Sequence, residues 1–211
     1  MSTMVLRFII IFSLLYIVSC LDEKPLAIKN TKVIKVQNPY KGYEDYSNFI
    51  IIYGSGFDIE EDNVITFPSS LTGSSSNVTI GGDIMVALLP SGIVDGKISL
   101  NVNDQIVESN DIIFSEEKYN VIDISSPIVN IDNIIPGIGL NTYDIIFTIN
   151  DDTGVILIAK GDGDVLGQTN LGLWVSGTYR MNGLAFDEGE AKISVMDISG
   201  HTSSSNIVKL Q

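Results

Sequence analysis

Short apolar runs separated by turn residues follow one another along the chain from residue 32 onward. One of them, Phe49–Tyr53, is rich in β-branched residues and ends at Gly54-Ser55-Gly56, after which Phe57 is expected to fold back onto a core. Runs of this length bounded by turn residues are typical of strands, and glycines allow a tight bend. No segment of the first half has a sustained helical apolar period. The pattern therefore predicts an all-β protein.

The expected strands form two series joined by the polar stretch 115–120. The first series covers 33–36, 49–53, 63–67, 77–80, 84–89, 96–102 and 112–114, with a Ser/Gly-rich loop at 68–76. The second covers 128–131, 142–149, 154–159, 173–175, 177–180, 191–196 and 206–210. Short strands at near-regular spacing predict two tandem β-sandwiches, at 32–115 and 121–211.

Three stretches of the first series resemble the IPT/TIG immunoglobulin-like domains. They are Ile52–Phe57 with its Gly-Ser-Gly-Phe turn, Val64–Phe67, and Leu89-Pro90 followed by Gly96–Val102. The loop 38–48 departs from the family, since it is longer and holds three tyrosines. The resemblance implies an immunoglobulin-like fold that serves as a spacer, an adhesion module, or a glycan- or protein-binding module.

The end of the chain resembles the last hairpin of bacterial immunoglobulin-like domains, which implies that 121–211 is a second such domain. There Asp197 and Gly200 suit a turn, because an aspartate hydrogen-bonds the turn backbone and a glycine permits a left-handed bend. His201, in the same turn, is interpreted as an exposed turn residue rather than a ligand or base.

The first twenty residues predict export. Arg7 precedes the apolar run 8–18, which is too short to span a bilayer and has the length of a signal-peptide core. The run ends in Ile17-Val18-Ser19-Cys20, which resembles a bacterial lipobox. The resemblance implies a signal peptide at 1–19, acylation of Cys20, and a lipidated tether at 20–31. Two or more acyl chains give stable anchoring. An ordinary secretory signal with an incidental cysteine is the alternative.

The acidic pair after Cys20 resembles the surface-export signal of some diderm lipoproteins. This favours an outer-membrane or cell-surface location, with the membrane itself as a partner through the lipid. The formal net charge of −14 disfavours nucleic-acid binding, because such a surface repels phosphate backbones. One cysteine and one histidine exclude an internal disulfide and a zinc site built from cysteine and histidine.

Two acidic turns are candidate calcium sites, since calcium prefers carboxylate and carbonyl oxygens on flexible backbone. They hold Asp151 and Asp152, and Asp162 and Asp164. Both also fit hairpin turns, where aspartate, asparagine and glycine are the usual residues.

Aromatic residues are candidate platforms for sugar rings, and those considered are Trp174, Tyr179, Tyr43 and Tyr46. For Trp174 a place in the core is the alternative, and the two tyrosines near residue 45 also fit a loop packed on its own domain. No residue set supplies a nucleophile, a base and a group that orients the base. The sequence therefore predicts a non-enzymatic surface lipoprotein that binds a glycan or a host or matrix protein, or alternatively a structural spacer or assembly subunit of an envelope complex.

Overall fold

The computed structural model describes residues 31–37, 48–59, 63–102, 104–111, 123–158, 172–186 and 189–210. In these ranges every regular element except one short 3-10 helix is a β-strand, and the strands pair antiparallel. The all-β prediction is confirmed. Several predictions lie outside these ranges: the signal peptide 1–19, Cys20, most of the tether, the strand at 112–114, and Tyr43, Tyr46, Asp162 and Asp164. The described residues contain no helix with the length and apolar character needed to cross a membrane.

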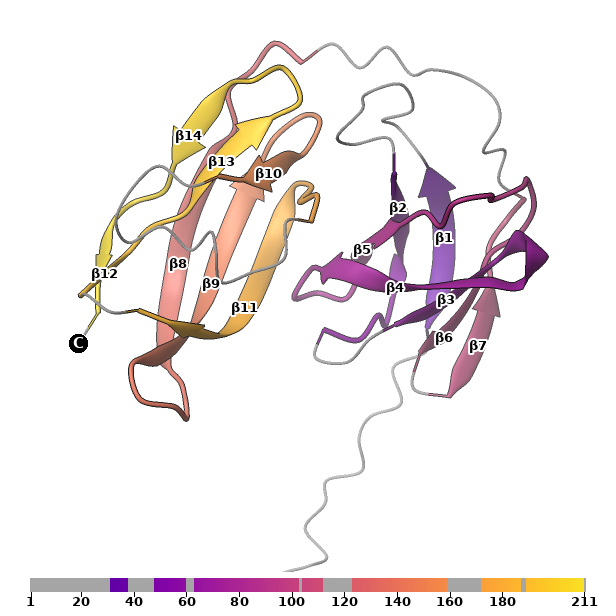
Figure 1. The fold of residues 1–211 in the computed structure, drawn as a ribbon, viewed down its shortest axis with the longest axis horizontal. Coiled ribbons are helices and arrows are strands. Elements are labelled where there is room, and N and C mark those ends of the chain that lie inside the picture. Colours follow the sequence, from indigo (N-terminus) through magenta and orange to yellow (C-terminus); the bar gives the residue numbers. More distant parts are fainter. Residues whose placement is uncertain are drawn as a thin grey trace, which may run out of the picture.

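One seven-stranded sheet, with the order β1-β2-β5-β4-β3-β6-β7, makes up the first half (Figure 1). Its elements are β1 (Lys32–Gln37), β2 (Phe49–Ser55), β3 (Val64–Phe67), the 3-10 helix η1 (Pro68–Ser70), β4 (Leu71–Val78), β5 (Ile84–Leu88), β6 (Ser99–Val102) and β7 (Gln105–Glu108). The sheet curves until its two edge strands approach each other, and the backbone N–H of Thr31 donates to Gln105 Oε1 at 3.1 Å. The core is enclosed by this curvature.

The Gly-Ser-Gly-Phe stretch, whose first two residues still belong to β2, closes that core as the sequence predicts. Phe57 is 1% exposed and packs among the buried residues of the first half. Gly54 is required by space, because a Cβ there would lie 2.0 Å from the carbonyl oxygen of Lys32. Gly56 adopts a φ of 77°, in the left-handed region that favours glycine.

The predicted loop at 68–76 is wrong for most of its length. Residues 71–78 form β4, which pairs with β3 on one side and with β5 on the other. Serine and glycine have low strand propensity, but pairing of residues 71–74 with β3 and of residues 75–78 with β5 overrides that preference. Gly73 also allows a close approach of the Phe67 ring, 3.1 Å from an added Cβ.

Three small antiparallel sheets make up the second half, with the orders β11-β9-β8, β10-β13-β14 and β12-β15. Their strands are β8 (Ile128–Pro136), β9 (Thr142–Asn150), β10 (Val155–Leu157), β11 (Gly177–Ala185), β12 (Glu190–Ala191), β13 (Ser194–Asp197), β14 (Thr202–Ser204) and β15 (Val208–Lys209). The two three-stranded sheets enclose a second core, centred on Phe147, Trp174 and Tyr179. The strand expected at 173–175 is reduced to a single bridge between Trp174 and Val155.

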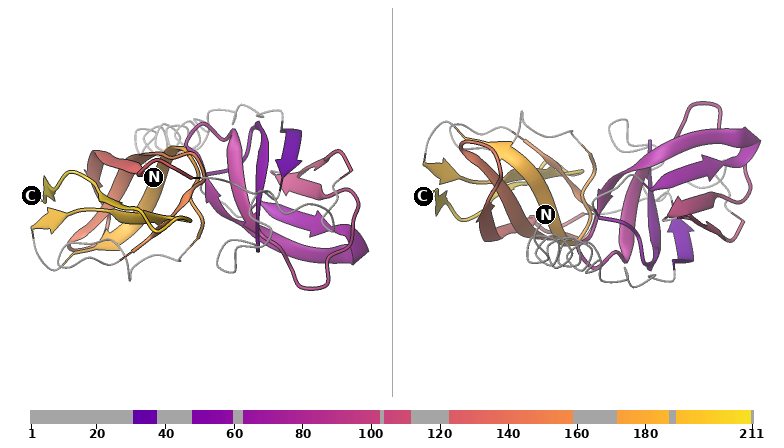
Figure 2. Two further views of the ribbon diagram at one scale, coloured as in Figure 1. Left: turned by 90° about the horizontal axis from the view of Figure 1, so that it is seen from above. Right: turned by 90° about the horizontal axis from the view of Figure 1, so that it is seen from below.

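A third apolar cluster joins the two halves, which lie side by side in both views of Figure 2. Phe49, Ile51 and Val86 from the first half pack against Leu173 and Val175 from the second. Two hydrogen bonds cross the same junction: the Asn77 side-chain amide donates to the carbonyl of Leu173 at 2.6 Å, and the N–H of Ile80 donates to the carbonyl of Thr178 at 2.8 Å. Each half therefore has its own core, and the two are packed together.

Candidate functional site

Trp174 and Tyr179 lie in the core of the second half. Trp174 is 5% exposed and Tyr179 is 1% exposed, and their rings meet edge to face with centroids 4.9 Å apart. The Tyr179 hydroxyl donates to the carbonyl of Val175 at 2.8 Å, and burial raises the pKa of this phenol. Neither ring offers an exposed face to a sugar, so the structure supports the core interpretation of Trp174 and places Tyr179 there too.

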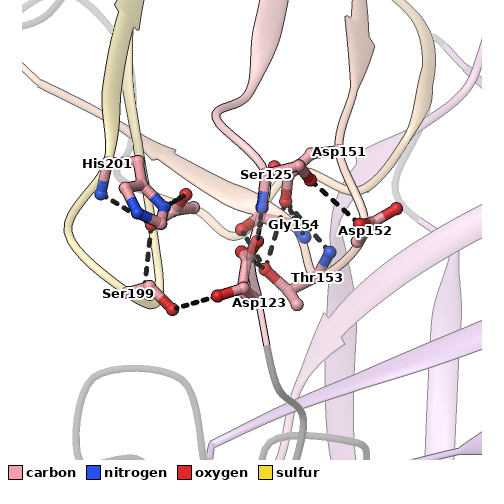
Figure 3. Close-up of polar contacts among 9 residues, drawn as sticks. Asp123, Ser125, Asp151, Asp152, Thr153, Gly154, Ser199 and His201 are labelled. Carbon is pink, nitrogen blue, oxygen red and sulfur yellow. Dashed lines mark hydrogen bonds and ion pairs between the residues drawn. The ribbon is translucent and has the colours of Figure 1, made fainter.

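A polar cluster lies at the start of the second half, ahead of β8, and three segments contribute to it (Figure 3). They are Asp123 ahead of β8, the β9–β10 turn with Asp151–Gly154, and the β13–β14 turn with Asp197–His201. Carboxylate oxygens of Asp123 and Asp197 and a ring nitrogen of His201 lie within 4.8 Å of one another. The cluster is therefore the densest group of possible cation ligands among the described residues.

Asp197 holds the β13–β14 turn. Its Oδ1 accepts hydrogen bonds from the backbone N–H groups of Ser199 and His201, both at 2.8 Å, and its Oδ2 lies 2.8 Å from His201 Nδ1. The aspartate side chain is fully buried, whereas that of His201 is 41% exposed. His201 is thus a partly exposed turn residue, as predicted, but it has a carboxylate partner that the sequence interpretation missed. The four-residue separation of Asp197 and His201 across a glycine turn is the signal that indicates this pair.

Asp151 holds the β9–β10 turn in the same way. Its Oδ2 accepts from the N–H groups of Thr153 at 3.0 Å and Gly154 at 2.6 Å, and the Thr153 hydroxyl lies between this oxygen and Asp123 Oδ2. Burial raises the pKa of Asp151, and the nearby Asp123 carboxylate adds to the shift. Asp152 is exposed and accepts from the Ser125 hydroxyl at 2.9 Å.

These hydrogen bonds favour the turn interpretation of Asp151 and Asp152. Calcium takes six to eight oxygen ligands, and here one oxygen of Asp151 and both oxygens of Asp197 already accept protein donors. Calcium binding stays a prediction.

A separate groove of about 440 Å³ lies in the second half. Its walls come from the end of β8, the start of β9 and the last residues of the chain. Apolar and polar side chains share the lining, which consists of Ile131, Asp132, Asn133, Ile134, Pro136, Tyr143, Asn206, Val208, Lys209 and Leu210.

A β-bulge shapes the wall of this groove. The register between β8 and β9 shifts between Ile131 and Asn133, so Asp132 is the extra residue and both Asp132 and Asn133 are exposed. The Asn206 side chain makes the two backbone hydrogen bonds that a neighbouring strand would make. Its Oδ1 accepts from the N–H of Ile131 at 2.8 Å, and its amide donates to the carbonyl of Ile131 at 3.2 Å. Bulges re-aim side chains and are over-represented beside functional sites.

Hydrogen bonds orient the polar side chains of the groove. Asp132 Oδ2 accepts from the Thr148 hydroxyl at 2.7 Å, and Asn133 Oδ1 accepts from the N–H of Ile134 at 2.9 Å. Because the N–H of Ile134 bonds the oxygen of the Asn133 side chain, the NH2 group of that side chain can donate to a ligand. Tyr143 is partly buried, and its ring meets the buried Phe186 edge to face at 6.1 Å. The groove thus combines apolar surface with a hydrogen-bond donor, a carboxylate and the exposed ammonium of Lys209, so that it offers both apolar and polar contacts to a small ligand.

Comparisons with known proteins give no family assignment. No protein-family model matches the chain, and no curated protein matches it. The IPT/TIG resemblance therefore stays a prediction. One solved structure, a crystal structure with xylogluco-oligosaccharide, is similar over 84% of this chain at 12% identity and a TM-score of 0.30. This chain covers 40% of that protein. A TM-score this low establishes no common fold, so function has to be argued from the residues of this chain.

Proposed function

We propose that this protein is a non-enzymatic, lipid-anchored protein of a bacterial cell surface that binds a glycan in the groove along β8 and β15. The observation that carries the proposal is the mixed lining of that groove, where Tyr143 and Pro136 lie beside Asp132, Asn133 and Lys209. Sugar rings present apolar C–H faces and hydroxyl edges, and such a surface can contact both. The proposal assumes two immunoglobulin-like domains and an acylated Cys20.

Binding is tested with the full-length protein in detergent against a glycan array that includes xylogluco-oligosaccharides, followed by calorimetry on the glycans that bind. Tyr143→Ala and Asn133→Ala are expected to weaken binding by about 1–2 kcal/mol each, as removal of a ring contact and of a hydrogen-bond donor predicts. Asn101→Ala is the control, since Asn101 is an exposed asparagine on β6 of the first half. An empty array, or equal affinities for all four proteins, contradicts the glycan proposal.

Anchoring is tested separately by labelling cells with a radioactive fatty acid. The wild-type protein should be marked, and Cys20→Ala should not. Equal labelling of the two proteins would show that Cys20 is not acylated, and it would not bear on glycan binding in the groove.

The second candidate is a spacer or assembly subunit of an envelope complex. The packed junction of the two halves favours it, because Phe49, Ile51 and Val86 fix one half against the other. Recovery of a defined envelope complex by crosslinking in cells, together with an empty glycan array, would select this role.

A further inference from the structure

The hairpin between β8 and β9 ends in an exposed apolar tip, defined here as residues 137–141. Ile138 and Leu140 are exposed to 109% and 92%, more than any other large apolar side chain among the described residues. Single exposed apolar residues are common on protein surfaces. Here two stand on one loop, and no residue from 134 to 143 carries a charge in a chain whose net charge is −14.

The tip is held in one conformation by its own backbone. The N–H of Gly137 donates to the carbonyl of Thr142 at 2.8 Å, and the Thr142 hydroxyl donates to the carbonyl of Gly139 at 2.9 Å. The N–H of Phe186 donates to the carbonyl of Asn141 at 3.1 Å, which ties the tip to the end of β11. Both glycines lie against Thr142, since an added Cβ would come within 2.8 Å of its side chain. These hydrogen bonds and close contacts hold the loop in a conformation that exposes both apolar side chains to solvent.

Asp144, the first acidic residue after the tip, is paired. Arg180 Nη2 lies 2.7 Å from Asp144 Oδ2, and the N–H of Gly183 donates to Asp144 Oδ1 at 2.9 Å. The tip carries no charge, and the Asp144–Arg180 ion pair at its base carries no net charge. Contact with a neutral, apolar environment therefore costs the tip no desolvation of an unpaired charge. It does not suit a cationic partner, which the net charge would otherwise attract.

The chain ahead of the described residues limits where that environment lies. Ten residues lie between Cys20 and Thr31, and the eleven Cα–Cα steps that join them reach at most about 40 Å in an extended chain. A lipid on Cys20 would therefore keep the start of β1 within this distance of the bilayer. In Figure 1 the start of β1 and the β8–β9 tip both lie at the lower side of the molecule.

We propose that the apolar tip inserts Ile138 and Leu140 into the surface of the bilayer that holds the lipid anchor. This contact rests on the proposed acylation of Cys20. It orients the protein on the membrane, because a lipid chain alone leaves the folded part free to turn. The proposal is for a zwitterionic bilayer surface, because the acidic protein would be repelled by anionic headgroups.

The test uses the full-length lipidated protein in phosphatidylcholine vesicles. Leu140→Cys supplies a thiol for an environment-sensitive fluorophore, and lipid already occupies Cys20, the only cysteine of the wild type. The probe at the tip should shift its emission to shorter wavelength and be quenched by lipids that carry a nitroxide near the headgroup. A probe on Ser91→Cys, in an exposed turn of the first half, should do neither. Adding Ile138→Ser should lower the ratio of inserted to free tip, obtained from the quenched fraction of the tip probe, at least about tenfold, as loss of one apolar side chain predicts.

Each outcome decides the proposal. Vesicle-bound protein whose tip probe behaves like the Ser91→Cys control overturns the tip contact alone. Protein that does not float with vesicles and whose wild type reacts with the fluorophore at Cys20 overturns the anchor and the tip contact together. If the tip probe is shielded from water in the absence of vesicles, and more strongly at higher protein concentration, the tip contacts a second copy of the chain and the membrane proposal is wrong.

Discussion

The junction between the two halves makes a sharp prediction at Ile51. This residue is 3% exposed and belongs to the apolar cluster that joins the halves, whereas its neighbours Ile50 and Ile52 belong to the core of the first half. Ile51→Asp places a carboxylate in the junction and leaves both cores complete. We expect the halves to separate rather than unfold, because separation returns the carboxylate to water.

The size of the effect follows from the burial of Ile51. Truncation of a buried isoleucine to alanine typically costs 2–5 kcal/mol, and Ile51→Ala should lower the free energy of unfolding by about 3 kcal/mol. For a chain of this size that corresponds to a fall in Tm of about 6–12 °C. For Ile51→Asp the loss is limited to the free energy of the junction itself, since separation avoids the larger penalty of a buried charge.

Two probes distinguish separation from unfolding in a urea titration. Trp174 is the only tryptophan and lies in the core of the second half, so its fluorescence reports that half alone, while far-ultraviolet circular dichroism reports both. The two transitions should coincide in the wild type and diverge in Ile51→Asp. Ile106→Asp is the control, since Ile106 is 72% exposed on β7 and its change should stay within about 0.5 kcal/mol. Coincident transitions in Ile51→Asp, with no greater loss than in the control, would refute a packed junction.

Three further predictions concern single polar groups of the second half. Tyr179→Phe leaves the carbonyl of Val175 without its donor and should lower the free energy of unfolding by about 1 kcal/mol in the same titration. The hydrogen bond from Arg180 lowers the pKa of Asp144. The free energy of unfolding of the wild type should therefore exceed that of Asp144→Asn above pH 3.8, the ordinary pKa, and the difference should disappear as the pH falls through the lowered pKa. Burial raises the pKa of Asp151, so wild type should lose stability relative to Asp151→Asn as the pH rises from 3.8 through the raised pKa; urea midpoints that move the other way would contradict this.

The strand pattern was largely predictable because alternation is a local property. The runs in β2, β5 and β9 each contain enough apolar residues to mark a strand without knowledge of its partners. The strand β4 was not predictable in this way, because Leu71–Val78 is mostly serine, threonine, glycine and asparagine. Its conformation depends on β3 and β5, which no local pattern indicates.

The candidate site was much less predictable, for a related reason. An aromatic residue in a strand can face either side, and the sequence does not say which face is covered; Trp174 and Tyr179 were therefore considered as ligand contacts although both are buried. Tyr143 stands in an ordinary strand pattern, and nothing in that pattern distinguishes it from a core residue. The groove around it depends on a bulge at Asp132 and on the clamp from Asn206, 75 residues away from Ile131.

Four consecutive residues at the start of β2 are apolar, and this lack of alternation indicates more than a strand. A strand with one covered face alternates, whereas Phe49, Ile50, Ile51 and Ile52 are all buried. The first half has a single curved sheet, so its own core can cover only one face of β2. The loss of alternation therefore requires a partner on the outer face, and the second half supplies it. It follows that the groove of the second half is held at a fixed orientation to β2 and to the rest of the first half.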